Sequence, residues 1–167
     1  MSGSAGDTVT IRLAKENMKF SAAHFTIFNA TERERLHGHN FRVEADIRAR
    51  MLGNGMCFDY GIYKDRIVAL CRELNEWTIL PTRSRYLRIE DAGEHVYAHF
   101  GGERIPFLRG DVLLLPIENA TLEEFAHWFL LRLGEDRESL RAHGIASIEV
   151  RVFSGPGQSA GRTMGFG

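Results

Sequence analysis

The feature that most constrains the fold is a long alternation of apolar and polar residues between His37 and Leu52. The apolar members recur at every second position, which is the period of a β-strand, because successive side chains point to opposite faces. They are Phe41, Val43, Ala45, Ile47 and Ala49. The pattern predicts one long strand whose apolar face must be covered, and self-association is one way to cover it.

The same strand begins with two histidines, His37 and His39, which are separated by one glycine. Side chains at positions i and i+2 of a strand point the same way, so the two imidazoles share a face. His24 lies a short distance upstream, and a neighbouring strand would bring it to the same patch. Three imidazoles are the ligands of an open Zn²⁺ site, which keeps a fourth position for water or substrate. The sequence therefore makes His24, His37 and His39 candidate ligands of a Zn²⁺ ion, while packed or surface positions for these histidines stay open at this point.

The remaining pattern predicts two helices and several shorter strands. A capping box, Thr121-Leu122-Glu123-Glu124, opens one amphipathic helix. Asp59 can cap another helix, which runs from Tyr60 towards Leu74. Apolar runs predict strands at residues 8–13, 18–28, 86–89, 95–100, 112–115 and 145–153, followed by a Gly-rich tail at 155–167. This order predicts an α+β fold with an antiparallel sheet and helices on one face.

Composition excludes two classes of partner. The 167 residues suit a single domain, and the net charge of −1 lacks the basic excess of a nucleic-acid binder. No apolar run approaches the ~18 residues that span a bilayer, so no membrane partner is expected. Residues 1–7 are expected to be a flexible leader rather than a signal peptide. Two cysteines without a C-x-x-C pattern fit a reduced, cytoplasmic protein.

Four motifs follow one another along the chain. They are Phe20-Ser21-Ala22-Ala23-His24, His37-Gly38-His39-Asn40-Phe41, Gly55-Met56-Cys57-Phe58-Asp59-Tyr60 and Ala120-Thr121-Leu122-Glu123. Their order resembles the 6-pyruvoyl-tetrahydropterin synthase family, which includes 6-carboxytetrahydropterin synthase of queuosine biosynthesis. The resemblance covers roughly residues 18–75 and 116–154. It implies a T-fold, in which an antiparallel four-stranded sheet carries two helices on one face, and a homo-oligomer, trimer or hexamer, with active sites between subunits.

The resemblance further implies that the three histidines bind Zn²⁺ and that the substrate is a reduced pterin made from GTP. The family's catalytic Cys would stand four residues before His37, where this chain has Arg33. Glu34 instead gives a Glu-x-x-His-Gly-His pattern. This pattern resembles the subgroup that cleaves the side chain of 7,8-dihydroneopterin to give 6-hydroxymethyl-dihydropterin. Glu34 could therefore act as a general base, although the charged run of residues 32–35 also suits a solvated surface.

Two departures from the family pattern leave the substrate open. Asn75 and Glu76 stand where the family has an Asp–His pair, and Ser154 replaces a carboxylate that anchors the pterin. Ser154 and Thr121 are nevertheless the expected substrate contacts. The first hypothesis is a zinc-dependent lyase acting on dihydroneopterin or its triphosphate. The alternatives are a zinc-binding T-fold protein with a different small-molecule substrate and one without catalytic activity.

Residues 81–116 are expected to be a β-rich insertion, because they have no counterpart in short family members. Three arginines of this segment could bind a phosphate, although a solvated surface suits them as well; they are Arg83, Arg85 and Arg88. His95 or His99 could replace the missing family histidine.

Overall fold

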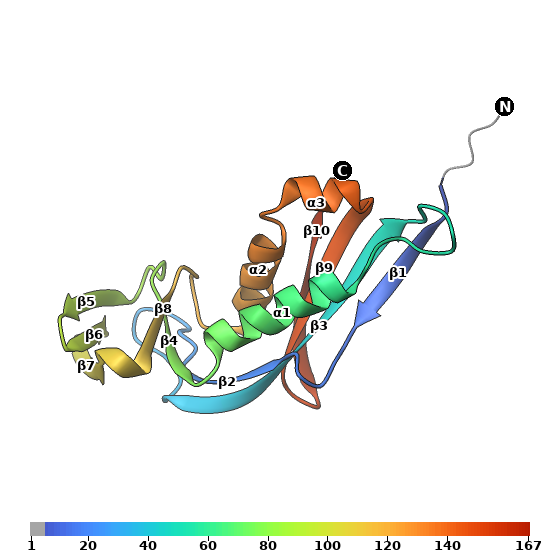
Figure 1. Ribbon diagram of the computed structural model, residues 1–167. Coiled ribbons are helices and arrows are strands. Elements are labelled where there is room, and N and C mark those ends of the chain that lie inside the picture. Colours follow the sequence, from blue (N-terminus) through green and yellow to red (C-terminus); the bar gives the residue numbers. More distant parts are fainter. Residues whose placement is uncertain (1–5) are drawn as a thin grey trace.

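The chain forms an α+β fold in which helices cover one face of a curled, mixed sheet (Figure 1). The computed structural model describes residues 6–167. The strands are β1 (Thr8–Leu13), β2 (Lys19–His24), β3 (His37–Arg50), β4 (Trp77–Pro81), β5 (Arg88–Ala92), β6 (His95–Phe100), β7 (Glu103–Leu108), β8 (Val112–Leu115), β9 (Ile145–Gly155) and β10 (Gln158–Gly165). The helices are α1 (Gly61–Leu74), α2 (Leu122–Leu133), α3 (Arg137–Ala142) and a 3₁₀ turn at Arg109–Asp111.

The larger sheet contains the predicted antiparallel core and extends it. Its strand order is β10-β9-β3-β2-β4-β8, and β1 pairs with the end of β3 that β2 leaves free. The strands β10, β9, β3 and β2 form three antiparallel pairs: β10 with β9, β9 with β3, and β3 with β2. The strand β4 lies parallel to β2, and β8 lies parallel to β4. The sheet is therefore mixed rather than purely antiparallel, a difference that apolar alternation within a strand does not reveal.

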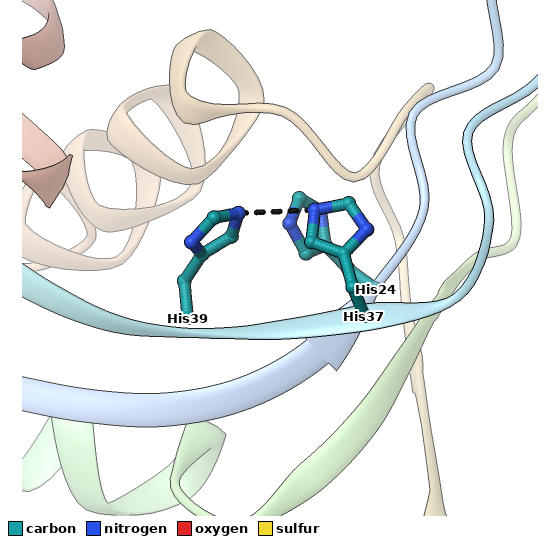
Figure 2. A group of neighbouring side chains, drawn as sticks. All are labelled: His24, His37 and His39. Carbon is teal, nitrogen blue, oxygen red and sulfur yellow. Dashed lines mark hydrogen bonds between the residues drawn. The ribbon is translucent and has the colours of Figure 1, made fainter.

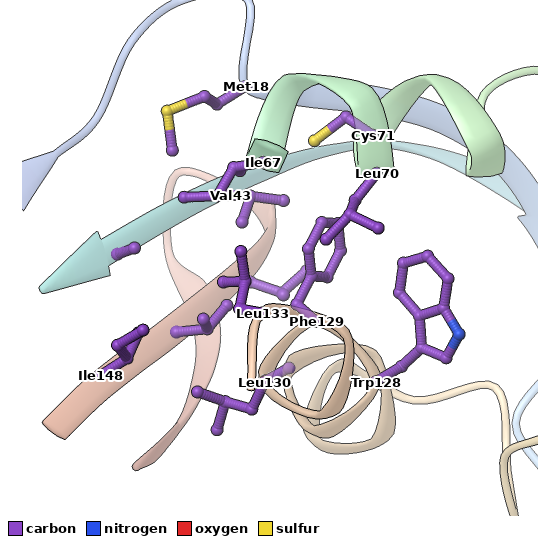
Figure 3. Close-up of a cluster of buried hydrophobic side chains, with 14 of the residues drawn as sticks. Met18, Val43, Ile67, Leu70, Cys71, Trp128, Phe129, Leu130, Leu133 and Ile148 are labelled. Atoms are coloured by element: carbon purple, nitrogen blue, oxygen red, sulfur yellow. The ribbon is translucent and has the colours of Figure 1, made fainter. Parts of the chain in front are cut away.

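The long strand β3 has one buried face, as the alternation predicts. Its buried side chains, each at most 1 % exposed, are Phe41, Val43, Ala45, Ile47 and Ala49. These residues share one apolar cluster with the buried faces of α1 and α2 (Figure 3). The chain's own helices thus cover this face, and the apolar side of β3 does not itself require a partner subunit.

The two predicted helices form, but only α2 has the expected side-chain cap, because the N-cap residue of α1 is Tyr60, whose side chain makes no capping hydrogen bond. The Asp59 carboxylate accepts a hydrogen bond from the Gly61 N–H at 2.9 Å, immediately before α1. The Thr121 hydroxyl accepts a hydrogen bond from the Glu124 N–H at 3.3 Å and caps α2. No helix in the described part of the chain combines the length and the apolar character that crossing a membrane would require.

A second apolar cluster joins the small sheet of β5, β6 and β7 to the segment that follows β2. Its buried members are Phe25, Ile27, Leu80, Leu87, Val96, Ala98, Phe100 and Val112. Phe25 and Ile27 alternate with His24 and Thr26, and side chains of an extended chain alternate between two faces. One face of residues 24–27 therefore anchors the small sheet, while the other carries His24 and Thr26.

Several elements differ from the sequence-based expectation. Residues 158–165, expected to be part of a Gly-rich tail, form β10, which pairs with β9 along its length. Backbone pairing of this kind needs no apolar pattern. The strands β4 and β7 and the helix α3 are also absent from the sequence prediction; α3 has only six residues and one buried side chain, Leu140. The expected leader, residues 1–7, lies mostly outside the described residues.

Replacing Phe129 by Ala should strongly destabilise the fold. This α2 side chain is 0 % exposed and faces Phe20 of β2, and removal of a buried aromatic ring costs about 3–5 kcal/mol. Leu131→Ala is the matched control, because Leu131 lies on the same helix but is 45 % exposed; it should change stability by less than about 0.5 kcal/mol. Urea denaturation at one protein concentration measures the free energy of unfolding of both variants. Equal decreases in that free energy would contradict the assigned buried face of α2.

Candidate functional site

The register of β2 against β3 brings the three predicted histidines together. The strands pair antiparallel, with His24 directly opposite His37 and Ala22 opposite His39. His37 and His39 share a face of β3, and His24 turns towards them from the neighbouring strand (Figure 2). The three ring centroids lie between 4.8 and 5.3 Å apart. The arrangement follows from strand geometry alone, since opposite residues of adjacent strands point to the same side.

Hydrogen bonds determine which nitrogen two of the imidazoles present. His24 Nδ1 donates to the Ala120 carbonyl at 2.7 Å, and His37 Nδ1 donates to the Arg35 carbonyl at 2.7 Å. In the neutral ring, Nε2 then carries the free lone pair. His24 Nε2 is buried and has no hydrogen-bond partner among the described residues. A buried polar atom without a partner is unfavourable, and a metal ion would satisfy it.

The donor atoms of the three histidines fit a metal ion. One nitrogen from each ring lies within 4.8 Å of the others. The Nε2 atoms of His37 and His39 lie 3.0 Å apart, and two lone pairs at that distance repel unless a proton or a cation lies between them. Donation of the second ring N–H to a backbone carbonyl is also typical of histidines that bind metals. Three neutral nitrogens are typical of a zinc site that keeps one position open.

Burial favours the uncharged form of His24. Removal from water lowers the pKa of His24, and the hydrogen bond to the Ala120 carbonyl only partly opposes this effect. The neighbouring imidazoles of His37 and His39 lower the pKa of His24 further. The ring is therefore neutral near pH 7, which is the form that binds metal ions.

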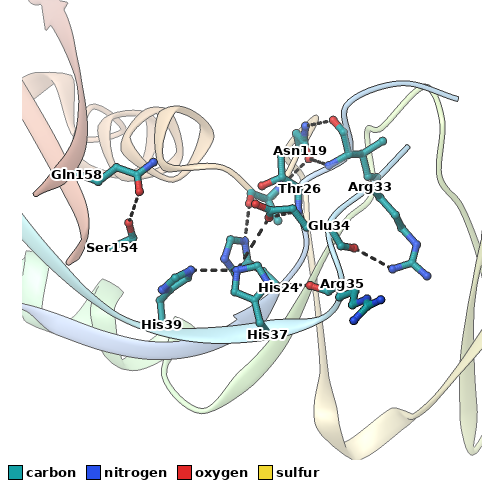
Figure 4. A network of polar contacts seen from close by, with 12 residues as sticks. His24, Thr26, Arg33, Glu34, Arg35, His37, His39, Asn119, Ser154 and Gln158 are labelled. Atoms are coloured by element: carbon teal, nitrogen blue, oxygen red, sulfur yellow. Dashed lines mark hydrogen bonds and ion pairs between the residues drawn. The ribbon is translucent and has the colours of Figure 1, made fainter. Parts of the chain in front are cut away.

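Glu34 lies beside the histidines on the loop that leads into β3 (Figure 4). Its Oε2 is 4.0 Å from His37 Nε2 and accepts a hydrogen bond from the Thr26 N–H at 2.9 Å. The Glu34 N–H in turn donates to the Thr26 carbonyl at 2.8 Å. Burial raises the pKa of Glu34, but the hydrogen bonds from Thr26, helped by electrostatic interaction with the neighbouring imidazoles, outweigh burial, so the pKa lies below its usual value. The carboxylate is ionised near neutral pH and can accept a proton.

All six predicted site residues border one cavity of about 310 Å³. Besides the three histidines and Glu34, it is lined by Thr121 at the start of α2 and by Ser154 near the end of β9. The Ser154 hydroxyl donates to Gln158 Oε1 at 3.4 Å (Figure 4). A space of this size suits a small molecule. The structure thus brings the six residues together, while their individual roles stay predictions.

The cavity also contains residues that the sequence does not single out. Glu123, in the first turn of α2, adds a second carboxylate, and Thr26 adds a hydroxyl two residues after His24. Gln158 enters from β10. The spacing of Thr26 from His24 is a signal that strand alternation could have provided. Gln158 gives no such signal, because β10 lacks the apolar pattern of a strand.

The two histidines considered as replacements for the missing family histidine do not reach the cavity within this chain, and neither do the two residues at the position of the family's Asp–His pair. His95 and His99 belong to β6 of the small sheet, where the His99 ring forms a hydrogen bond with the Glu90 carboxylate. Asn75 and Glu76 follow α1 and bind the backbone of β2 through the Asn75 side chain and the Glu76 N–H. None of these four residues lines the cavity.

The three arginines considered for phosphate binding do not line the cavity. Arg83 and Arg85 border a separate hollow of about 390 Å³, which shares Phe28 with the histidine cavity. Arg88 begins β5 and borders neither space. A phosphate-binding role for these arginines stays a prediction.

Proteins of known sequence resemble most of this chain. The family model described as 6-pyruvoyl tetrahydropterin synthase matches residues 12–163. A Methanocaldococcus jannaschii protein with the provisional name 6-carboxy-5,6,7,8-tetrahydropterin synthase is 28% identical over 144 residues, which are 86% of this chain and 88% of that protein. A Pyrococcus horikoshii protein with the same provisional name is 25% identical over 142 residues, which are 83% of this chain and 81% of that protein.

Solved structures resemble the whole fold. The 6-pyruvoyl tetrahydropterin synthase of Plasmodium falciparum matches with a TM-score of 0.89 and 28% identity, over 95% of this chain and 98% of that chain. A Plasmodium vivax 6-pyruvoyltetrahydropterin synthase in which a glutamate named as a catalytic residue is replaced by alanine matches with a TM-score of 0.89 and 26% identity, over 95% of this chain and 99% of that chain. The predicted T-fold is confirmed by these similarities.

The purified protein should contain one zinc ion per chain. His37→Ala or His39→Ala should remove most of the zinc, because only two imidazoles would remain to hold it. His95→Ala is the control, since His95 lies on β6 outside the cavity, and it should keep the parent zinc content. Elemental analysis after dialysis measures the metal content, and undiminished zinc in both site variants would contradict the assignment.

Proposed function

The chain belongs to the 6-pyruvoyl tetrahydropterin synthase family, and we propose that it is a zinc-dependent lyase acting on the side chain of a dihydropterin. The substrate class is 7,8-dihydroneopterin or its triphosphate. The observation that carries the proposal is Glu34, whose carboxylate lies 4.0 Å from His37 in the cavity that the three histidines line. A proton acceptor and a metal-binding group then face the same small molecule.

The three histidines would hold the zinc ion. A bound zinc ion would supply positive charge that stabilises negative charge on a substrate oxygen. His24 and His37 are prepared for this role by the hydrogen bonds of their Nδ1 atoms to backbone carbonyls. These bonds leave the lone pair of Nε2 free to bind a metal ion in each ring.

Glu34 would take the proton of a hydroxyl on the substrate side chain. The electrons of that O–H bond form a carbonyl, and the adjacent carbon–carbon bond breaks, with its electron pair left on the carbon attached to the pterin ring. The carbon attached to the pterin ring then receives a proton from Glu34, so that an aldehyde leaves and 6-hydroxymethyl-dihydropterin remains. A glutamate is named as a catalytic residue in the Plasmodium vivax relative, which supports a carboxylate in this role.

The remaining polar groups of the cavity would bind the substrate. Thr121 and Ser154 offer hydroxyls from α2 and β9, and Glu123 offers a carboxylate. A carboxylate can accept two N–H bonds from the donor edge of a pterin, and such charged hydrogen bonds are stronger than those of a hydroxyl. Glu123 would therefore supply the contact that Ser154, as a neutral group, supplies less well.

Glu34→Gln should lower kcat on 7,8-dihydroneopterin by roughly 10²–10⁴, because a positioned general base contributes that much. The zinc content should be unchanged, since Glu34 is not among the three proposed ligands. Glu32→Gln is the matched control: it changes an exposed carboxylate of the same loop that does not line the cavity, and it should keep parent activity. The assay is turnover of 7,8-dihydroneopterin and of its triphosphate, with identification of the products by mass spectrometry.

Full turnover by Glu34→Gln would show that Glu34 is not the general base of the reaction. Absence of turnover on both substrates by the parent protein would favour the alternative functions, a zinc-binding T-fold protein with another small-molecule substrate or without catalytic activity. Ser154 is the residue that favours these alternatives, because it lacks the charge that anchors a pterin in the family.

We expect the protein to be a homo-oligomer, a trimer or a hexamer. The strand β10 ends the strand order of the larger sheet, and a terminal strand offers unpaired backbone groups to a neighbouring chain. Closure of such edges into a barrel would satisfy them. Light scattering after size-exclusion chromatography should give a mass of three or six chains, and a stable monomer at micromolar concentration would contradict the expectation.

A further inference from the structure

Asn119 joins two distant parts of the chain through its side-chain amide. Its Oδ1 accepts hydrogen bonds from the Ile27 N–H at 3.1 Å and from the Ala120 N–H at 3.0 Å. Its Nδ2 donates to the Ile27 carbonyl at 2.8 Å. The oxygen faces two donors and the nitrogen faces an acceptor, so the partners themselves determine the orientation of the amide. One half-buried side chain thus binds both backbone groups of Ile27.

Each of the two joined segments holds a group of the candidate site (Figure 4). On one side, the carbonyl of the fully buried Ala120 accepts the His24 Nδ1–H at 2.7 Å. On the other side, Ile27 directly follows Thr26, whose N–H binds the Glu34 carboxylate at 2.9 Å. The position of residues 119–120 relative to residues 24–27 therefore decides whether the bond from His24 to Ala120 forms, and Asn119 also holds Ile27, the residue next to the partner of Glu34.

We propose that Asn119 is a positioning residue for the metal ligand His24 and for the carboxylate of Glu34. The inference rests on the proposed function, because it takes His24 as a zinc ligand. The amide binds the Ala120 N–H and so holds residue 120 where its carbonyl receives the Nδ1–H of His24. This bond directs Nε2 towards the other histidines. The Ala120 carbonyl is the outer partner of this ligand, and loss of such a bond weakens metal affinity by about 10–100-fold.

The fold should survive removal of the amide. Phe25 and Ile27 are 1 % and 5 % exposed, and both belong to the apolar cluster beneath the small sheet. This packing keeps residues 24–27 attached to the molecule without Asn119. The effect of the amide should therefore appear in the orientation of His24 and Glu34 rather than in global stability.

The test measures zinc affinity by competition with a chelator, in variants whose folding is checked by circular dichroism. Asn119→Ala should bind zinc about 10-fold more weakly than the parent, at the lower end of the range for loss of a direct outer partner, because the Ala120 carbonyl itself stays in place. Asn119→Asp keeps the two accepted hydrogen bonds and loses the donated one, so its zinc affinity should lie between those of the parent and of Asn119→Ala. The visible spectrum of the cobalt-substituted protein should change in both variants, because it reports the geometry of the ligands.

Asn29→Ala is the matched control. Asn29 Oδ1 also accepts two backbone hydrogen bonds, from Thr31 and Glu32 at 2.9 Å each, but none of its hydrogen bonds reaches Ile27 or Ala120. This variant should keep the parent zinc affinity and the parent cobalt spectrum. A merely structural role for Asn119 would instead predict similar behaviour of the two alanine variants.

Parent zinc affinity in folded Asn119→Ala would overturn the proposal, as would an equal loss in Asn29→Ala. If Asn119→Ala does not fold, Asn119→Asp decides by the same measurements. His24→Ala separates the two proposals. If His24→Ala keeps its zinc, the metal assignment fails; if it loses zinc while both Asn119 variants bind zinc like the parent, only the positioning role fails.

Discussion

The pairing of β2 with β3 is the constraint on which the rest of the site depends. A shift of one residue would turn the side chains of one strand to the opposite face, and His24 would then point away from His37. Phe20 lies opposite Phe41 in the same register, and their buried rings stack with centroids 4.9 Å apart. The apolar pair that stabilises the core therefore also holds the register that aligns the histidines.

Residues 24–27 connect the main core, the small sheet and the site. Phe25 and Ile27 pack into the second apolar cluster, while His24 and Thr26 border the cavity. The small sheet thus packs against one face of residues 24–27, and the other face carries His24, a candidate metal ligand, and Thr26, the partner of Glu34. Mutations in the second cluster can consequently influence the site without contacting it.

The sequence predicts those parts of the molecule that depend on local periodicity. The alternation around Phe41 gives β3, and the spacing of His37 and His39 places both imidazoles on one face. The tail strand β10 depends on pairing with β9 rather than on its own side chains, so its Gly-rich sequence gives no sign of it. The cavity position of Gln158 cannot be predicted for the same reason, because a residue on an unrecognised strand has no predicted neighbours.

The hydrogen bond from Thr26 gives Glu34 a role different from that of the histidines. A carboxylate near a metal ion can itself become a ligand, and it then ceases to be a free proton acceptor. One oxygen of Glu34 is bound to the Thr26 N–H, and the loop is bound to the same residue through the Glu34 N–H. These two bonds restrict the carboxylate to a position 4.0 Å from His37 Nε2. In the proposed reaction, this restraint keeps the Glu34 carboxylate beside the histidines but outside their ligand set. The same hydrogen bonds lower the pKa of Glu34, so they also make the carboxylate a weaker base.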